Sequence, residues 1–89
     1  TGAATLVSNI SGFGSSGDIV FDPLNNRFLA TSGGAGSDKL FSIALNGAAT
    51  EIGNLGFNDV YGLFFENGGL FGYTANRQQI KIDLATGAG

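Results

Sequence analysis

The sequence has 89 residues, of which 43% are apolar and 12% charged, and its formal net charge is −3. This composition excludes a disordered chain, which would combine low hydrophobicity with a high net charge. The four basic residues form no cluster that could neutralise several phosphates, so nucleic acid is not expected as a partner. Cysteine and histidine are absent, which removes disulfides, thiolate catalysis, the usual general base and the usual zinc ligands.

A repeated motif organises the chain. Gly2-Ala3-Ala4-Thr5 returns as Gly47-Ala48-Ala49-Thr50, and a truncated copy stands at 86–89, so the repeat is 45 and then 40 residues long. Units of this length that contain several short strands are typical of β-propeller blades. We therefore expect 1–89 to be a single all-β domain of about two blades. Its units lie at 1–45 and 46–85, and the start of a third lies at 86–89.

The alignment of the units also predicts the strands. Each unit should contain an outer, an inner, a second and a third strand in chain order, together forming a four-stranded antiparallel sheet. In the first unit the strands are expected at 6–10, 17–22, 27–32 and 41–45. In the second unit they are expected at 52–55, 61–66, 70–74 and 80–84. Because each unit begins with its outer strand, the blades are circularly out of phase with the chain.

Turns and small residues support the alignment. The segments 23–26 (PLNN) and 67–69 (NGG) follow the inner strands and contain residues that tolerate the positive φ of a hairpin turn. Ala30 and Gly72 align within the second strands, where a small residue indicates the close approach of a neighbouring group. We assign that group to the next blade.

The phase of the repeat leaves strands without partners. The N-terminal outer strand has no sheet of its own, and the last third strand lacks an outer neighbour, so N–H and C=O groups would be exposed at sheet edges. Two blades cannot close a ring, because propellers have about 4 to 8 blades. We therefore expect a homo-oligomer, either a head-to-tail ring or a strand-swapped dimer. Since Thr1 lies inside a repeat, we also expect the sequence to be part of a longer one.

The segment KLFSIALNGAAT at 39–50, followed by DVYGLFF at 59–65 and GLFGYT at 69–74, resembles the blades of secreted or surface bacterial propeller proteins. Those blades have the pattern LYxIDLxTGAAT…VYGLAF…LYGxT. The resemblance covers nearly the whole chain, and the absence of tryptophan separates it from WD40 blades. It implies a propeller located at the bacterial cell surface or outside the cell. The first unit departs from the pattern at 15–17, so any role of Tyr61 is not duplicated there.

Carboxylates are the remaining candidates for catalysis. Asp59 and Glu66 could act as the acid and base of a glycosidase if they converged across a cleft. However, Asp59 opens a predicted strand and Glu66 precedes a predicted turn, which are ordinary positions for solvated acids. We therefore predict that the chain is not an enzyme.

Asp22, Asn25 and Asn26 suggest a calcium site, because calcium accepts oxygen ligands crowded in a loop. Three side chains fall short of its about 6 to 8 ligands. A hairpin turn stabilised by local Asp and Asn hydrogen bonds is the favoured interpretation. No other metal site and no cofactor are expected, and no apolar run approaches the roughly 20 residues that span a bilayer.

The predicted function is a non-catalytic binding or scaffold module that completes its sheets by self-association and presents loops to a protein or glycan. Its expected ligand contacts are Asn58, Asp59, Tyr61, Asn76 and Arg77. Most of the aromatic residues in the second unit are expected to be core because of their strand positions, and Tyr61 and Tyr73 are the best candidates for exposure. The residues considered are Phe57, Tyr61, Phe64, Phe65, Phe71 and Tyr73. The alternative is a fragment of a larger propeller whose function, for example a carboxylate-based glycan hydrolase or lyase, lies in other blades.

Overall fold

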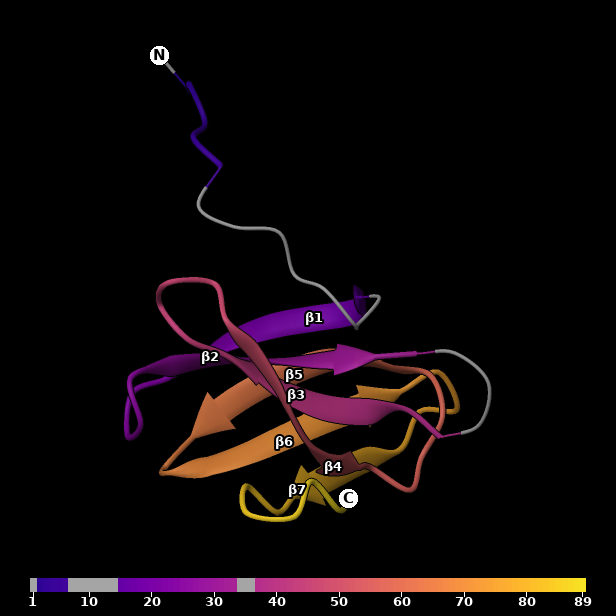
Figure 1. The fold of residues 1–89 in the computed structure, drawn as a ribbon. Coiled ribbons are helices and arrows are strands. Elements are labelled where there is room, and N and C mark those ends of the chain that lie inside the picture. The colour runs from indigo at the N-terminus through magenta and orange to yellow at the C-terminus, as the bar shows by residue number, and fades with distance from the viewer. Residues whose placement is uncertain (1, 7–14, 34–36) are drawn as a thin grey trace.

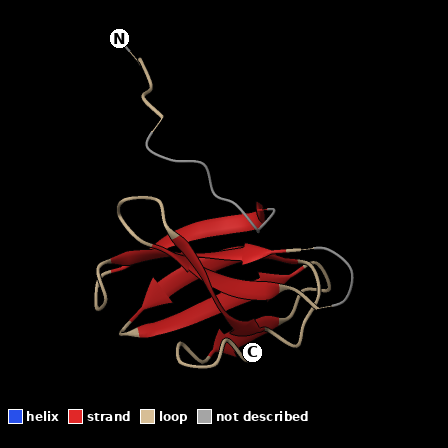
Figure 2. Cartoon of the chain, in the orientation of Figure 1, coloured by secondary structure: helices blue, strands red, loops and turns tan. Residues whose placement is uncertain are grey.

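The computed structural model describes residues 2–6, 15–33 and 37–89. Within these residues every regular element is a β-strand, and the strands form two antiparallel sheets (Figures 1 and 2). The prediction of an all-β chain is therefore confirmed. The described residues include no helix of the length and apolar character needed to cross a membrane.

Each sheet is a simple meander in which strands adjacent in sequence are hydrogen-bonded neighbours. Sheet A has the order β1-β2-β3-β4 and sheet B the order β5-β6-β7. The strands of sheet A are β1 (Ser15–Asp22), β2 (Arg27–Ser32), β3 (Lys39–Ile43) and β4 (Ala49–Asn54). Those of sheet B are β5 (Val60–Glu66), β6 (Gly69–Thr74) and β7 (Gln79–Ile82).

The strands expected from residue 17 onward are all present, with small shifts at their ends. The predicted third strands are too long, because β3 ends at Ile43 and β7 at Ile82. Leu45 is therefore exposed in a turn rather than buried on a strand. That turn closes when the Ala44 N–H donates to the Ala48 carbonyl at 2.8 Å. The outer strand expected at 6–10 is not confirmed: residues 2–6 belong to neither sheet, and 7–10 lie outside the described residues.

The two sheets repeat the same strand register. In sheet A, Phe28 pairs with Phe21 on one side and Ile43 on the other. In sheet B, Leu70 pairs with Phe65 and Ile82 in the same way. Both sheets also have a bulge near the start of their first strand. This agreement confirms that the units align as the sequence predicts, and it extends to the pairs Ala30–Phe41 and Gly72–Ile80.

The predicted hairpin turns are also confirmed. Asn67 and Gly68 have φ values of 50° and 78°, as a two-residue turn with left-handed backbone requires, and they join β5 directly to β6. Asn26 has a φ of 51° in the longer turn between β1 and β2. Asparagine adopts this backbone conformation more readily than most residues with a Cβ atom.

The main core lies between the two sheets, where β1 and β2 pack against β5. Each fully buried aliphatic side chain there contributes about 1.5–3 kcal/mol to folding. The buried members are Leu29, Leu40, Leu55, Val60, Leu63, Leu70, Ile80 and Ile82. A second, smaller cluster lies on the other side of sheet A and contains Ala30, Phe41 and Ile43, with Phe28 and Ala49 packed against it.

Gly72 is buried, but the close approach at this position differs from the prediction. A Cβ atom on Gly72 would lie 3.0 Å from Cγ1 of Val60 and 3.3 Å from Cδ1 of Ile82. Both neighbours belong to sheet B itself, on the strands that flank β6. The small residue therefore accommodates side chains of its own sheet rather than the adjacent one.

Candidate functional site

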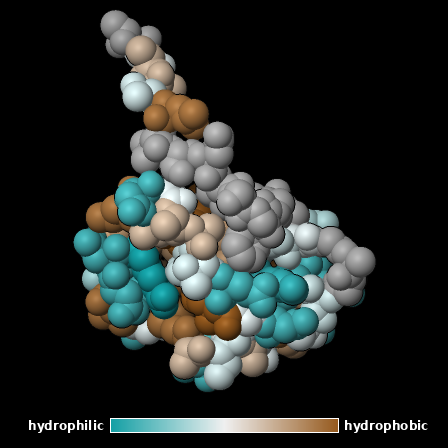
Figure 3. Space-filling model, viewed as in Figure 1, coloured by the Kyte–Doolittle hydropathy of each residue, from teal (hydrophilic) through white to brown (hydrophobic). Residues whose placement is uncertain are grey.

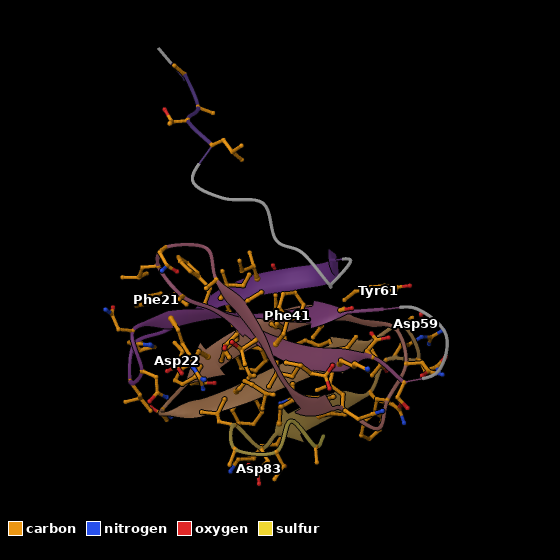
Figure 4. All side chains as sticks on the ribbon, in the orientation of Figure 1. Phe21, Asp22, Phe41, Asp59, Tyr61 and Asp83 are labelled. Atoms are coloured by element: carbon orange, nitrogen blue, oxygen red, sulfur yellow. The ribbon has the colours of Figure 1, made fainter. Side chains whose placement is uncertain are left out.

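The expected ligand contacts gather at one end of sheet B. The β4–β5 connection carries Asn58 and Asp59, and the β6–β7 turn carries Asn76 and Arg77. These two loops are joined where the Ala75 N–H donates to the Asp59 carbonyl at 3.0 Å. All four side chains and Tyr61 are exposed. Figure 4 shows Asp59 and Tyr61 at this end, with Phe21 and Asp22 at the other.

Asp59 and Tyr61 interact directly. The Tyr61 hydroxyl donates to Oδ1 of Asp59 at 3.0 Å. This hydrogen bond is the main cause that raises the pKa of Tyr61 above its ordinary value of 10.0, and the negative charge of Asp59 is the second. Tyr61 therefore presents an exposed aromatic ring whose hydroxyl proton is held by a neighbouring carboxylate. Asp59 and Arg77 also adopt positive φ values of 55° and 65°, a conformation that few arginines take.

Asp38, which was not among the residues predicted from the sequence, forms hydrogen bonds that stabilise this end of the molecule. Its side chain is only 2% exposed, and Oδ2 accepts the Val60 N–H at 2.8 Å. Its backbone N–H donates to the Phe57 carbonyl, and its carbonyl accepts the Leu55 N–H, each at 2.9 Å. Asp38 therefore fixes the β4–β5 connection that carries Asn58 and Asp59.

Two further side chains of sheet A bond to the backbone of β5. The Thr31 hydroxyl donates to the Val60 carbonyl at 2.9 Å, and Oδ2 of Asp18 accepts the Leu63 N–H at 3.3 Å. Because buried backbone groups are costly when unpaired, these bonds favour one position of β5 against sheet A. Local sequence carries no signal for them, since each joins residues more than 25 positions apart.

The acidic pair considered for catalysis does not converge. Asp59 precedes the first residue of β5 and Glu66 is its last, so about 20 Å of extended strand separates them. Glycosidase carboxylates lie about 5–9.5 Å apart. Within one copy of this chain, Asp59 and Glu66 therefore cannot act on the same glycosidic bond.

The Asp22 turn has the hydrogen bonds that the turn interpretation requires. Oδ1 of Asp22 accepts the backbone N–H groups of Leu24 and Asn25 at 3.0 and 3.3 Å. Oδ2 accepts Nδ2 of Asn25 at 2.9 Å and Nε of Arg27 at 3.1 Å. Both oxygens of this buried carboxylate are therefore engaged by donors from the turn, and Asn26 supplies the left-handed residue.

These contacts predict a pH effect. Burial raises the pKa of Asp22, but the hydrogen bonds from Asn25, Arg27 and the backbone outweigh it, and the pKa lies below its ordinary value of 3.8. A lowered pKa stabilises the folded state above the unfolded-state pKa, and this contribution disappears as the pH falls through the folded-state pKa. The stability advantage of the wild type over Asp22→Asn should therefore be constant above about pH 5 and shrink below about pH 4. Urea unfolding of both proteins between pH 2.5 and 7 measures this difference, and an advantage that does not change with pH would contradict it.

Comparison with protein-family models, curated sequences and solved structures gave no match. The described residues also contain no group of three or more acidic side chains placed to hold a metal ion.

Proposed function

We propose that this chain is a non-catalytic binding and scaffold module of the β-propeller type, in which each sheet is one blade and self-association supplies the strand that one copy lacks. One observation carries this proposal. Sheet B repeats the register of sheet A over three strands, yet among the described residues β7 pairs with β6 alone. An unpaired edge of this kind favours the addition of another strand.

The N-terminal segment has the sequence of the strand that sheet B lacks. In sheet A this position belongs to β4, whose first residues, Ala49 and Thr50, pair with Ile43 and Ser42 of β3. The motif that contains Ala49 and Thr50 is repeated at 2–5, and residues 2–6 are exposed and form no strand. Figure 1 shows this segment on the opposite side of the body from β7. A second copy could therefore place its N-terminal segment beside β7.

The loops at the Tyr61 end provide the binding surface in this proposal. They combine an exposed aromatic ring with amide, carboxylate and guanidinium groups, a mixture suited to a protein or glycan ligand. The separation of Asp59 and Glu66 favours binding over hydrolysis at this surface. The resemblance to exported propellers supports an extracellular or cell-surface location in this proposal.

Sedimentation equilibrium of the full chain over a wide concentration range tests the proposal. We expect masses above 9.0 kDa that correspond to whole numbers of copies and decrease on dilution. Thr5→Pro should weaken this association, because proline lacks the N–H group needed in a strand ladder, and the change falls outside both sheets. Thr5→Val, which keeps the N–H group, is the matched control. A single-copy species at every concentration would contradict the proposal.

A further inference from the structure

Each sheet has an inward face, which packs against the other sheet, and an outward face. On β2, Leu29 and Thr31 point inward: Leu29 belongs to the main core, and Thr31 bonds to β5. Their equivalents on β6 in the aligned register are Phe71 and Tyr73. Leu70, also on β6, points into the core. Because side chains alternate between the two faces of a strand, Phe71 and Tyr73 lie on the outward face of sheet B. The outward face of sheet B thus corresponds to the inward face of sheet A.

Aromatic rings cover this outward face. Phe64 stacks on Phe71 with ring centroids 5.1 Å apart and on Tyr73 with centroids 5.6 Å apart. Phe64 and Phe71 are half-buried, and Tyr73 is 46% exposed. We name Phe64, Phe71 and Tyr73 the aromatic face. Their equivalents in sheet A are Val20, Leu29 and Thr31, which form the surface that packs on sheet B.

Sheet A exposes apolar side chains on the part of its outward side that β1 and the start of β2 form, whereas Phe41 and Ile43 of β3 on that side are buried within one copy. Ile19, Phe21 and Phe28 lie there, at the positions that Leu63, Phe65 and Leu70 occupy on the inward side of sheet B. Ile19 is 54% and Phe21 41% exposed, and the Phe21 and Phe28 rings meet edge to face with centroids 5.3 Å apart. We name these three residues the receiving face. Figure 3 shows apolar side chains interrupting the polar surface of the molecule.

We infer that the aromatic face of one copy packs against the receiving face of a second copy, in a head-to-tail interface that repeats the contact between sheets A and B within the chain. This inference rests on the proposed function and specifies the partner and the surfaces. Exposed apolar surface favours association in general, and here each face has the position of a face that is already buried in the same molecule. Because the two faces differ, the interface is heterologous and leads to rings or filaments.

Completion of sheet B at its open edge leads to the same head-to-tail order of copies. Within the chain, β4 completes sheet A and leads into β5 of the adjoining sheet. Correspondingly, the N-terminal segment of the second copy would complete sheet B and lead into β1 of the sheet that receives the aromatic face. One partner copy therefore covers both the aromatic face and the β7 edge.

A surface hollow lies where this strand would begin. It borders the end of β7 and the turn after it, and its lining includes Gly69, Ile82 and Ala88. At the corresponding position of sheet A, Ala49 of β4 pairs with Ile43 and packs against the cluster that contains it. Apolar residues of the N-terminal motif would fill the hollow in the same way.

The interface between copies differs chemically from the internal one. Asp18, Thr31 and Asp38 fix sheet B to sheet A, but the equivalent positions in the second unit hold Gly62, Tyr73 and Arg77. The contact between copies therefore depends on apolar burial and strand pairing without these side-chain bonds. We therefore expect the association to be reversible on dilution.

Charge substitutions that block one face at a time test the inference. Tyr73→Lys blocks the aromatic face and leaves the receiving face intact, whereas Ile19→Lys does the opposite. Each variant alone should self-associate about tenfold or more weakly than the wild type, the loss expected when an interface anchor is removed. Mixed together, they should form a 1:1 pair of twice the 9.0 kDa mass, because the intact face of each meets the intact face of the other. Leu24→Lys, at a leucine that is 66% exposed in the β1–β2 turn and belongs to neither face, is the matched control and should assemble like the wild type.

The outcomes separate this inference from the proposed function. If the wild type assembles but Tyr73→Lys and Ile19→Lys assemble equally well, or if both are weakened and their mixture stays unpaired, the head-to-tail faces are wrong while self-association stands. A wild type that is monomeric throughout overturns both. Formation of the mixed pair itself shows that both variants fold, and far-UV circular dichroism of each alone checks the fold independently.

Discussion

Replacing Asp38 with alanine is expected to lower the free energy of unfolding by about 2–3 kcal/mol, because it leaves the buried Val60 N–H without an acceptor. The loss should be largest at the β4–β5 connection, which Asp38 also bonds through its backbone. Urea unfolding followed by circular dichroism measures the global effect. Amide hydrogen exchange at Val60 measures the local one.

The matched control is Asp38→Asn, which keeps a side-chain oxygen in reach of the Val60 N–H. It should retain most of the stability that alanine loses. If alanine and asparagine have equal effects, or if neither changes stability, the hydrogen bond from Val60 is not what holds the connection.

Gly53→Ala is the second substitution with a large expected effect. Gly53 lies in β4, and a Cβ atom there would overlap the backbone carbonyl of Thr86. Backbone atoms cannot rotate away, so the turn after β7 must shift, and the bond from the Gly89 N–H to the Leu55 carbonyl is disturbed. We expect a loss of about 1–3 kcal/mol, as for other overpacked sites, measured by thermal or urea unfolding.

Gly62→Ala is the control for this effect. Gly62 is also a strand glycine, but a Cβ atom there would lie 3.6 Å from Cβ of Tyr73, an ordinary van der Waals distance. Its stability should be unchanged or slightly higher, because alanine restricts the unfolded chain. Equal losses at both positions would show that the C-terminal turn does not contact β4.

The repeat made the strands and their alignment predictable from sequence. Period-two alternation placed β3 and β7, and the aligned motif fixed which residues of the two units are equivalent, as the Phe28 and Leu70 pairings confirm. Strand ends were less predictable, because Leu45 and Leu84 continue the alternation although the backbone has already turned. Hydrophobic pattern alone does not mark where pairing stops.

Contacts between the sheets could not be predicted in the same way. Asp38 stands before a strand like many solvated acids, and only the folded chain brings it to Val60. The outward position of Phe71 was predictable in principle, because Phe71 lies two residues before the exposed Tyr73 and therefore on the same face of the strand. The expectation that strand position makes most of the aromatic residues core did not consider which face of the strand each one occupies.

The candidate binding end was partly predictable. Turn-forming residue types located Asn58, Asp59, Asn76 and Arg77 in loops, and the structure brings those loops together through Ala75 and Asp59. The hydrogen bond from Tyr61 to Asp59 and its effect on the pKa of Tyr61 required the geometry, because Asp59 has left-handed rather than extended backbone.

Register-specific disulfide formation between copies tests the central claim most directly. If the N-terminal segment repeats the β3–β4 pairing, Thr5 of one copy faces Lys81 of the next, as Thr50 faces Ser42. The chain has no cysteine, so Thr5→Cys with Lys81→Cys provides the only two thiols. Under mild oxidation this variant should form disulfide-linked oligomers.

Thr5→Cys with Gln79→Cys is the control, because Gln79 lies on the same face of β7 but two residues away. That diagonal separation is about 7–8 Å, beyond the reach of an unstrained disulfide. Linked oligomers from the Lys81 variant, with few from the Gln79 variant, are the predicted result. Equal linkage in both variants, or linkage only within single copies, would contradict the account.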